Sequence, residues 1–282
     1  MSFLAALGVM LCIAFLVFNI KNRNVRLIKM SSPNINNLIL VGCILVYTSV
    51  IVQDVKGLWL DCLCHVRLYL TVLGFSLGYG AMFAKTWRVY EIMTASRRFT
   101  KVTKDLRDSR LLMTVLVLVA INLLVLVIWT AFDPMAMTPK DIEDSEIDRE
   151  DDVLEIKQTL VCQSRYQLQF TLGLIALQAL LILFGAFLAF QTRKMTIPEL
   201  NDSRWVGLCI YNVVVLGSLG TILVLGTSQT PHVNYLLMSI ITTLGTTLTQ
   251  CLVFVPKPAS GVGYPFTLFR SPSLYLWHFP SN

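Results

Sequence analysis

Seven uninterrupted apolar runs constrain the fold of this chain more than any other feature of its sequence. Each run has about the 20 residues that an α-helix needs to cross the hydrocarbon core of a bilayer. The runs cover residues 2–20, 34–53, 64–90, 111–132, 166–191, 204–226 and 233–255. Only 14% of the residues are charged, whereas soluble domains have about 25%. The sequence therefore predicts an all-α membrane protein, folded as a seven-transmembrane helix bundle.

The basic residues between the runs are distributed unevenly, and their distribution predicts the orientation in the membrane. The segments after the first, third and fifth runs are rich in lysine and arginine. The segments after the second and sixth runs have few basic residues, and the one after the fourth is mostly acidic. By the positive-inside rule the basic segments are cytoplasmic. We therefore expect a multi-pass membrane protein with an extracellular N-terminus. The first run has no basic n-region and no small-residue cleavage site, so we interpret it as a span and not as a signal peptide.

No ionisable side chain stands out at the middle of the runs, and this observation argues against several classes of protein. Polar side chains inside the runs include Asn122, Gln178, Tyr211, Asn212 and Gln250. In lipid such groups usually form hydrogen bonds between helices. Proton-coupled transporters and intramembrane proteases normally need ionisable groups at that depth, so neither class is favoured. The net charge of +6 comes from short clusters in the connections, the seven cysteines form no CxxC pair, and the three histidines are isolated. We predict no enzyme activity, no metal or cofactor and no nucleic-acid partner.

The third run contains the features around which we organise the functional prediction. Gly74 and Gly78 stand four residues apart, a spacing that lets two helices approach closely in lipid. Lys85 lies near the cytoplasmic end, where it either snorkels to the interface or pairs with a carboxylate on another helix. Asp202, at the start of the sixth run, has the same predicted depth. It suits a helix N-terminus as well as an ion pair with Lys85, and the two roles are compatible.

The cysteines at the predicted extracellular side suggest one disulfide. Cys62 and Cys64 lie at the outer end of the third run, and Cys162 lies just before the fifth. Because the exterior is oxidising, we expect a disulfide from the third helix to the long acidic segment 133–164. We favour Cys64 because it adjoins the helix. Cys62 is the alternative partner, and three free thiols is the remaining possibility.

Taken in order, the border motifs of the runs are similar to those of the seven-helix domain of metabotropic GABA-B receptors, which are class C G-protein-coupled receptors. The matching pieces are residues 18–24, 31–33, 36–38, 74–89, 200–203, 210–213 and 252–257, with Cys64, Val66, Arg67, Trp129, Asp133, Pro134 and Cys162. Rhodopsin-like signatures, Asp-Arg-Tyr after the third run and Asn-Pro-x-x-Tyr in the seventh, are absent from the sequence. Residues 31–33 and 197–198 resemble the coupling subunit, type 2, whereas residues 74–80 are closer to the ligand-binding subunit, type 1.

The resemblance implies a role for several residues. The family's cytoplasmic ionic lock falls on Lys85 and Asp202, and its disulfide falls on Cys64 and Cys162. Its partners would be a heterotrimeric G protein, a second GABA-B-type subunit and membrane lipid. The loop that faces the G protein would include Arg97, Arg98, Lys101, Lys104 and Arg107. Tyr211 and Asn212 would belong to a face where two subunits meet, although ordinary packing within one bundle is equally compatible with them.

The sequence also departs from the family. An acidic residue of the fourth span is replaced by Asn122, and a lysine of the fifth by Gln178. The bilobed ligand-binding domain and the coiled coil have no counterpart in the sequence. We therefore expect residues 1–257 to be a receptor domain that transmits an extracellular signal to a G protein, and residues 258–282 to be a disordered tail. The alternatives are a non-signalling partner subunit or dimerisation scaffold and, less favoured, a small-molecule transporter.

Overall fold

The structure, a computed structural model, describes residues 1–24, 32–53, 60–97, 108–141, 158–192, 202–226 and 231–254. In these ranges the chain forms seven long helices and one hairpin. They are α1 (Ser2–Lys21), α3 (Pro33–Gln53), α4 (Leu60–Arg97), α5 (Asp108–Phe132), β1 (Ala136–Asp141), β2 (Gln158–Gln163), α6 (Gln167–Thr192), α7 (Asp202–Gly226) and α8 (Pro231–Phe254). All seven helices are long and apolar enough to cross a membrane. The predicted seven-helix bundle is confirmed, and the predicted tail lies outside the described residues.

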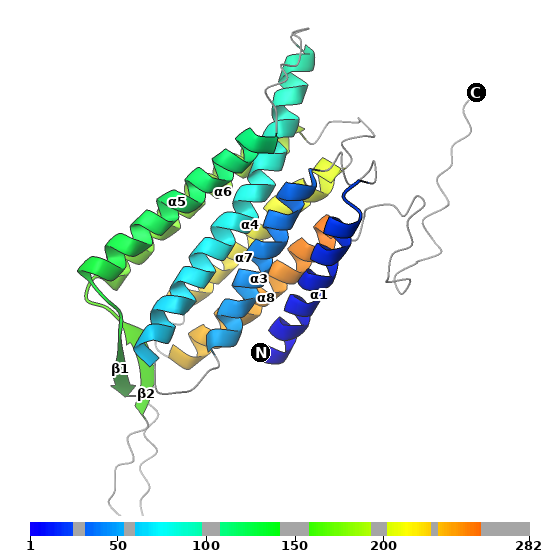
Figure 1. The fold of residues 1–282 in the computed structure, drawn as a ribbon. Helices are drawn as coiled ribbons and strands as arrows, with labels where there is room; N and C mark the ends of the chain where they lie inside the picture. Colours follow the sequence, from blue (N-terminus) through cyan, green and yellow to red (C-terminus); the bar gives the residue numbers. More distant parts are fainter. Residues whose placement is uncertain are drawn as a thin grey trace, which may run out of the picture.

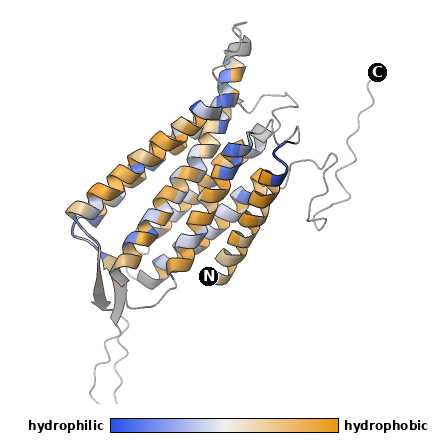
Figure 2. Cartoon of the chain, in the orientation of Figure 1, coloured by the Kyte–Doolittle hydropathy of each residue, from blue (hydrophilic) through white to orange (hydrophobic). Residues whose placement is uncertain are grey.

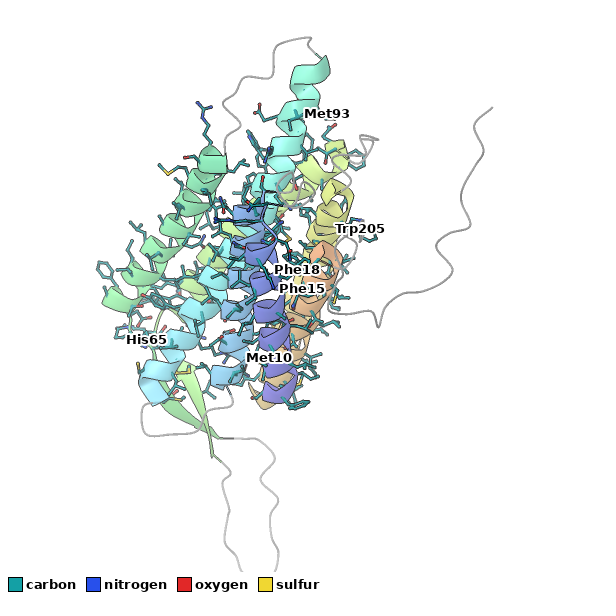
Figure 3. All side chains as sticks on the ribbon, turned by 45° about the vertical axis from the view of Figure 1, so that its right-hand side comes forward. Met10, Phe15, Phe18, His65, Met93 and Trp205 are labelled. Atoms are coloured by element: carbon teal, nitrogen blue, oxygen red, sulfur yellow. A yellow bond between two sulfur atoms is a disulfide. The ribbon has the colours of Figure 1, made fainter. Side chains whose placement is uncertain are left out.

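The central helix of the bundle is α4, which contacts α3, α5, α6 and α7. The helix α1 packs against α3 and α8, and α7 packs against α6 and α8 (Figure 1). The N-terminus and the β1–β2 hairpin lie at the same end of the bundle, here called the hairpin end (Figure 1). Figure 3 places His65 near this end of α4 and Met93 near the other, with Trp205 of α7 toward the Met93 end. That second end is here called the Lys85 end.

The outer faces of the helices are apolar over most of their length (Figure 2). Large hydrophobic side chains stand out from the bundle on several helices, among them Phe3, Met113, Leu180 and Ile222. Polar side chains are buried inside instead, including Asn36, Ser76, Asn122 and Gln250. A lipid environment favours this arrangement, because hydrocarbon covers apolar surface at no cost while polar groups need partners within the protein.

Glycines bring α3 and α4 close together. A Cβ atom added to Gly42 on α3 would lie 2.5 Å from the backbone nitrogen of Gly78 and 2.8 Å from the carbonyl oxygen of Gly74. A Cβ atom added to Gly78 would come no closer than 3.8 Å to any atom of α3. The predicted close approach at Gly74 and Gly78 is therefore present, and the glycine that it needs most is Gly42, on the opposite helix.

Candidate functional site

Lys85 lies on the central helix α4 and is half-buried. Its Nζ donates a hydrogen bond to Oδ1 of Asn36 on α3 at 2.6 Å, and Asn36 is completely buried. One turn further along α4, the Arg88 guanidinium donates to the hydroxyl oxygen of Ser32. Two cations of α4 thus bond to the first turn of α3 and its flanking residue. Both side chains leave α4 on the same face because they are three residues apart.

The start of α3 is built to receive these two cations. The carbonyl of Ser32 accepts hydrogen bonds from the backbone nitrogens of Ile35, at 3.0 Å, and Asn36, at 3.2 Å. Pro33 occupies the first helical position, where its missing N–H costs nothing. Ser32 has a φ of 54°, a conformation that is uncommon outside glycine. It is nonetheless buried, and its hydroxyl bonds to Arg88, so the surrounding contacts hold this conformation.

Asn19 joins α1 to the same region. Its Nδ2 donates to the carbonyl of Pro33 at 3.0 Å and to Oδ1 of Asn37 at 2.5 Å. Asn19 is only 3% exposed. The resulting group, here called the Lys85 cluster, consists of Asn19, Ser32, Asn36, Asn37, Lys85 and Arg88. It ties α1, α3 and α4 together at one end of the bundle with hydrogen bonds that the apolar spans cannot supply.

The structure describes only part of Asp202, the predicted partner of Lys85. Asp202 is the first residue of α7, and α7 contacts α4, so the two helices are neighbours, as the depth argument requires. The side chain of Asp202 lies outside the described part, as do those of Arg97, Arg98, Lys101, Lys104 and Arg107. Sequence reasoning missed Asn36 as an acceptor for Lys85. The only available signal was its position near the start of α3, at the same membrane depth.

The two residues predicted for a subunit interface point in different directions. Tyr211 is 38% exposed on the outer side of α7. Asn212 turns inward, and its Nδ2 donates to the carbonyl of Gly245 on α8 at 3.2 Å. Consecutive residues of an α-helix are about 100° apart, so these neighbours do not share one face. Asn212 therefore contributes to packing between α7 and α8.

A second polar group, here called the amide hub, lies within the bundle at the junction of α4, α5 and α6. The Nε2 of Gln178 donates to Oδ1 of Asn122 at 2.9 Å and to the hydroxyl of Ser76 at 3.2 Å. Asn122 in turn donates to the carbonyl of Leu118, and Ser76 donates to that of Val72. These bonds connect three helices through neutral side chains.

The hairpin end is held by a disulfide and a hydrogen-bonded corner. Cys64 of α4 is bonded to Cys162 of β2, with 5.9 Å between their Cα atoms, and Cys62 is a free, exposed thiol. The backbone nitrogen of Met135 donates to Nε2 of His65 at 3.1 Å. The carboxylate of Asp133, just after α5, accepts from the backbone nitrogens of Tyr166, at 2.7 Å, and Arg165, at 3.2 Å.

Asp133 is half-buried, and the pKa of its carboxyl is lowered from the usual range, chiefly by the hydrogen bond from the Tyr166 backbone. Nearby, the indole N–H of Trp129 donates to the hydroxyl of Ser164 at 3.3 Å, and its ring stacks on Phe170 with centroids 5.3 Å apart. This corner fixes the end of α5 to the start of α6. Nowhere in the described ranges do three histidine, cysteine or acidic side chains gather as a metal site would require.

Seven apolar helices, six of them grouped about α4, with a basic cluster at one end and a disulfide at the other, form a seven-helix membrane domain. No part of this arrangement resembles a catalytic centre within the described residues. The chain belongs to the class C G-protein-coupled receptors, since the family described as "7 transmembrane sweet-taste receptor of 3 GCPR" matches residues 1–257. It is therefore a multi-pass membrane protein.

Curated relatives narrow the comparison to GABA-B receptors. Gamma-aminobutyric acid type B receptor subunit 2 from Homo sapiens is 38% identical over 263 residues, which is 91% of this chain and 28% of that protein. Subunit 2 from Caenorhabditis elegans is 37% identical over 265 residues, 91% of this chain and 30% of the relative. Subunit 1 from Mus musculus is 35% identical over 262 residues, 91% of this chain and 27% of the relative. The chain thus spans less than a third of the length of these proteins. The resemblance to GABA-B receptors is confirmed, and the relatives are receptors, not enzymes.

Proposed function

We propose that this chain is the signal-transducing seven-helix domain of a GABA-B-type receptor. It would lie in the plasma membrane with its N-terminus outside and pass an extracellular signal to a heterotrimeric G protein. Membership of class C and the similarity to both GABA-B subunits support this proposal. The disulfide at the hairpin end fits an extracellular location for that end, because the cytosol keeps thiols reduced. The basic connections would then face the G protein, with Arg97, Arg98, Lys101, Lys104 and Arg107 in the contact loop.

The Lys85 cluster is the observation that carries the proposed mechanism. Lys85 is half-buried on the central helix, so its charge needs acceptors, and Asn36 supplies a neutral one. We infer that Asp202, at the start of the neighbouring helix α7, supplies the charged one. In the resting state Lys85 would bond to both, which ties α7 to α3 through α4. When α7 moves away to admit the G protein, Lys85 would keep its bond to Asn36 and lose the one to Asp202.

A small change in the free energy of the Lys85–Asp202 ion pair is enough to change basal signalling. An exposed ion pair typically contributes about 0–1 kcal/mol, and removing one partner of a more buried pair costs more because the other charge is left uncompensated. Losing about 1.4 kcal/mol changes an equilibrium constant tenfold, which is enough to raise signalling in the absence of ligand. A switch of this kind requires two arrangements of α7 relative to α4, each stabilised by different contacts.

The test is basal G-protein activation by the receptor that contains this domain, expressed with its partner subunit. Asp202→Ala and Lys85→Ala should each raise basal signalling, and exchanging the two residues should partly restore the resting level. Arg165→Gln, an exposed residue between β2 and α6 at the hairpin end, removes a charge at the opposite end of the bundle from the cluster and is the matched control. Basal signalling that stays at the control level in well-expressed variants would refute the lock.

A second subunit of the GABA-B type is the proposed partner, together with membrane lipid on the remaining apolar surface. An outward stripe on α7 suits a helix-to-helix contact: Tyr211, Val215, Leu219 and Ile222 are all exposed. The same stripe would serve a non-signalling partner subunit. Coupling of the purified chain to a G protein in lipid nanodiscs separates the two functions, because a scaffold would dimerise without accelerating nucleotide exchange.

A further inference from the structure

Two buried cysteines meet between α1 and α3, outside the sites described above. Cys12 of α1 is 0% exposed, and Cys43 of α3 is 5% exposed. Their thiols are hydrogen-bonded to each other. Both are free thiols, and both belong to the apolar core of the bundle. The two sulfur atoms thus form a pair that the proposed signalling mechanism does not use.

The packing of α1 on α3 accounts for this pair independently. A Cβ atom added to Gly8 would lie 2.5 Å from Cζ of Tyr47, whereas Asn19, later in α1, bonds to the first turn of α3. The two helices are therefore antiparallel. Cys12 follows Gly8 by four residues, and Cys43 precedes Tyr47 by four, so both cysteines lie one turn along on the contacting faces. Helix packing creates the pair, so a search of the sequence for a CxxC motif could not find it.

Two thiols in contact offer ligands to a soft metal ion. Thiolate sulfur is the ligand that soft ions prefer, and a coordinating thiol loses its proton. The ion therefore takes the place of the two thiol hydrogens. A divalent ion and two thiolates form a neutral complex, whereas a monovalent ion would leave a negative charge that apolar surroundings oppose. We propose that Cys12 and Cys43 bind one soft divalent metal ion, in linear coordination, which bridges α1 to α3.

The surroundings of the pair favour an ion that two ligands satisfy. No third histidine, cysteine or acidic side chain joins the pair in a metal site within the described ranges. Structural zinc takes four ligands, so it does not suit this pair, whereas Hg(II) is satisfied by two sulfur atoms in a line. The helix α1 lies at the edge of the bundle, and its outer side chains, such as Phe3 and Met10, are exposed. A small outward displacement of α1 therefore gives the sulfur atoms the separation that a bridging ion needs.

Mercuric chloride is the probe, because this neutral molecule enters an apolar bundle without carrying a charge. Two Hg–S bonds form, the two chlorides leave, and the two thiol protons are released. The test uses the full chain in lipid nanodiscs, with Cys62→Ser and Cys251→Ser to remove the two exposed thiols. The chain is treated with one equivalent of mercuric chloride and washed with excess iodide, which competes for mercury without reducing the disulfide. Intact-mass measurement should then find one mercury atom per chain.

Two alanine variants in this background identify the ligands. Cys12→Ala and Cys43→Ala should each lower the retained mercury at least about tenfold, because a single thiol lacks the effective concentration that the second supplies. Cys209→Ala is the matched control. It removes the other buried free thiol, which contacts the backbone of α8, and should leave the retained mercury unchanged.

If an alanine variant does not fold, serine at the same position removes the thiol with less change in size and should cause the same loss. Three results would overturn the proposal. They are a background chain that retains no mercury, equal retention in a folded Cys12 or Cys43 variant, and loss of the mercury in Cys209→Ala.

Discussion

Replacing Gly42 by alanine should loosen the contact between α3 and α4 more than any comparable change at the other two glycines. The added Cβ would lie 2.5 Å from the Gly78 nitrogen and 2.7 Å from its Cα. These are backbone atoms of the central helix, so no side-chain rotation relieves the clash and the helices must separate. At Gly74 the nearest atoms are the Cβ of Leu45 and a methyl carbon of Val46, both at 2.9 Å, and the carbonyl oxygen of Gly42 at 3.0 Å, so the clash is smaller by a few tenths of an ångström. At Gly78 the nearest atom is at 3.8 Å, which is an ordinary contact.

The expected difference in stability between the Gly42→Ala and Gly78→Ala variants follows from two opposing effects. Overpacking a well-packed interior typically costs about 1–3 kcal/mol. Alanine is a better helix former than glycine by about 1 kcal/mol. At Gly42 this gain offsets part of the cost of overpacking. At Gly78 there is no overpacking, so the gain stabilises the protein in full. The two variants should therefore differ in stability by about 1–3 kcal/mol. At about 2–4 °C per kcal/mol, this corresponds to a difference in Tm of several degrees.

Thermal unfolding in one detergent, followed by the loss of the monodisperse peak on size-exclusion chromatography, measures this difference. Gly42→Ala should melt lowest, Gly74→Ala between the two, and Gly78→Ala at or above the wild type. The reasoning is refuted if Gly42→Ala melts with Gly78→Ala, because the close backbone contact would then not exist.

Three further predictions concern other contacts. Hydrogen bonds to the carboxylate lower the pKa of Asp133. The charged carboxylate therefore stabilises the fold at pH values above the usual aspartate pKa, and this stabilisation is lost as the pH falls through the lowered pKa. In a plot of Tm against pH, Asp133→Asn should reduce the fall in Tm at acid pH. Replacing Cys64 and Cys162 by serine should destabilise the fold by about 2–4 kcal/mol, and dithiothreitol should lower the wild-type Tm but not that of the variant. Asn122→Leu and Gln178→Leu should each lower the Tm, and a double-mutant cycle should show coupling of about 0.6–1.7 kcal/mol; strict additivity would contradict the amide hub.

The sequence predicted the helices well because the requirements for crossing a bilayer apply to each segment by itself. A span must be apolar and about 20 residues long, and both properties can be counted along the chain. The observed helices begin and end within a few residues of most predicted runs. The exception is α4, which extends to Leu60–Arg97 where the run covers 64–90. Polar helical residues beyond the hydrocarbon core carry no apolar signal, so hydropathy alone does not find them.

Contacts between helices were harder to predict because they depend on how each helix is rotated. Gly42 is a single glycine in a long apolar run, and nothing in its surroundings marks it as facing Gly74 and Gly78. Asn36 bonds to Lys85 because α3 is rotated so that this side of its first turn faces α4. The inward direction of Asn212 was within reach of the sequence, since 3.6 residues per turn place it about 100° from Tyr211.

The amide hub has a consequence for how this domain responds to its membrane. Moving one elementary charge across the bilayer couples to the membrane potential by about 2.3 kcal/mol per 100 mV. Ser76, Asn122 and Gln178 are joined by hydrogen bonds between neutral groups, so a rearrangement at this junction would move no net charge and would gain nothing from depolarisation. The stability of this three-helix junction should therefore be the same at any membrane potential.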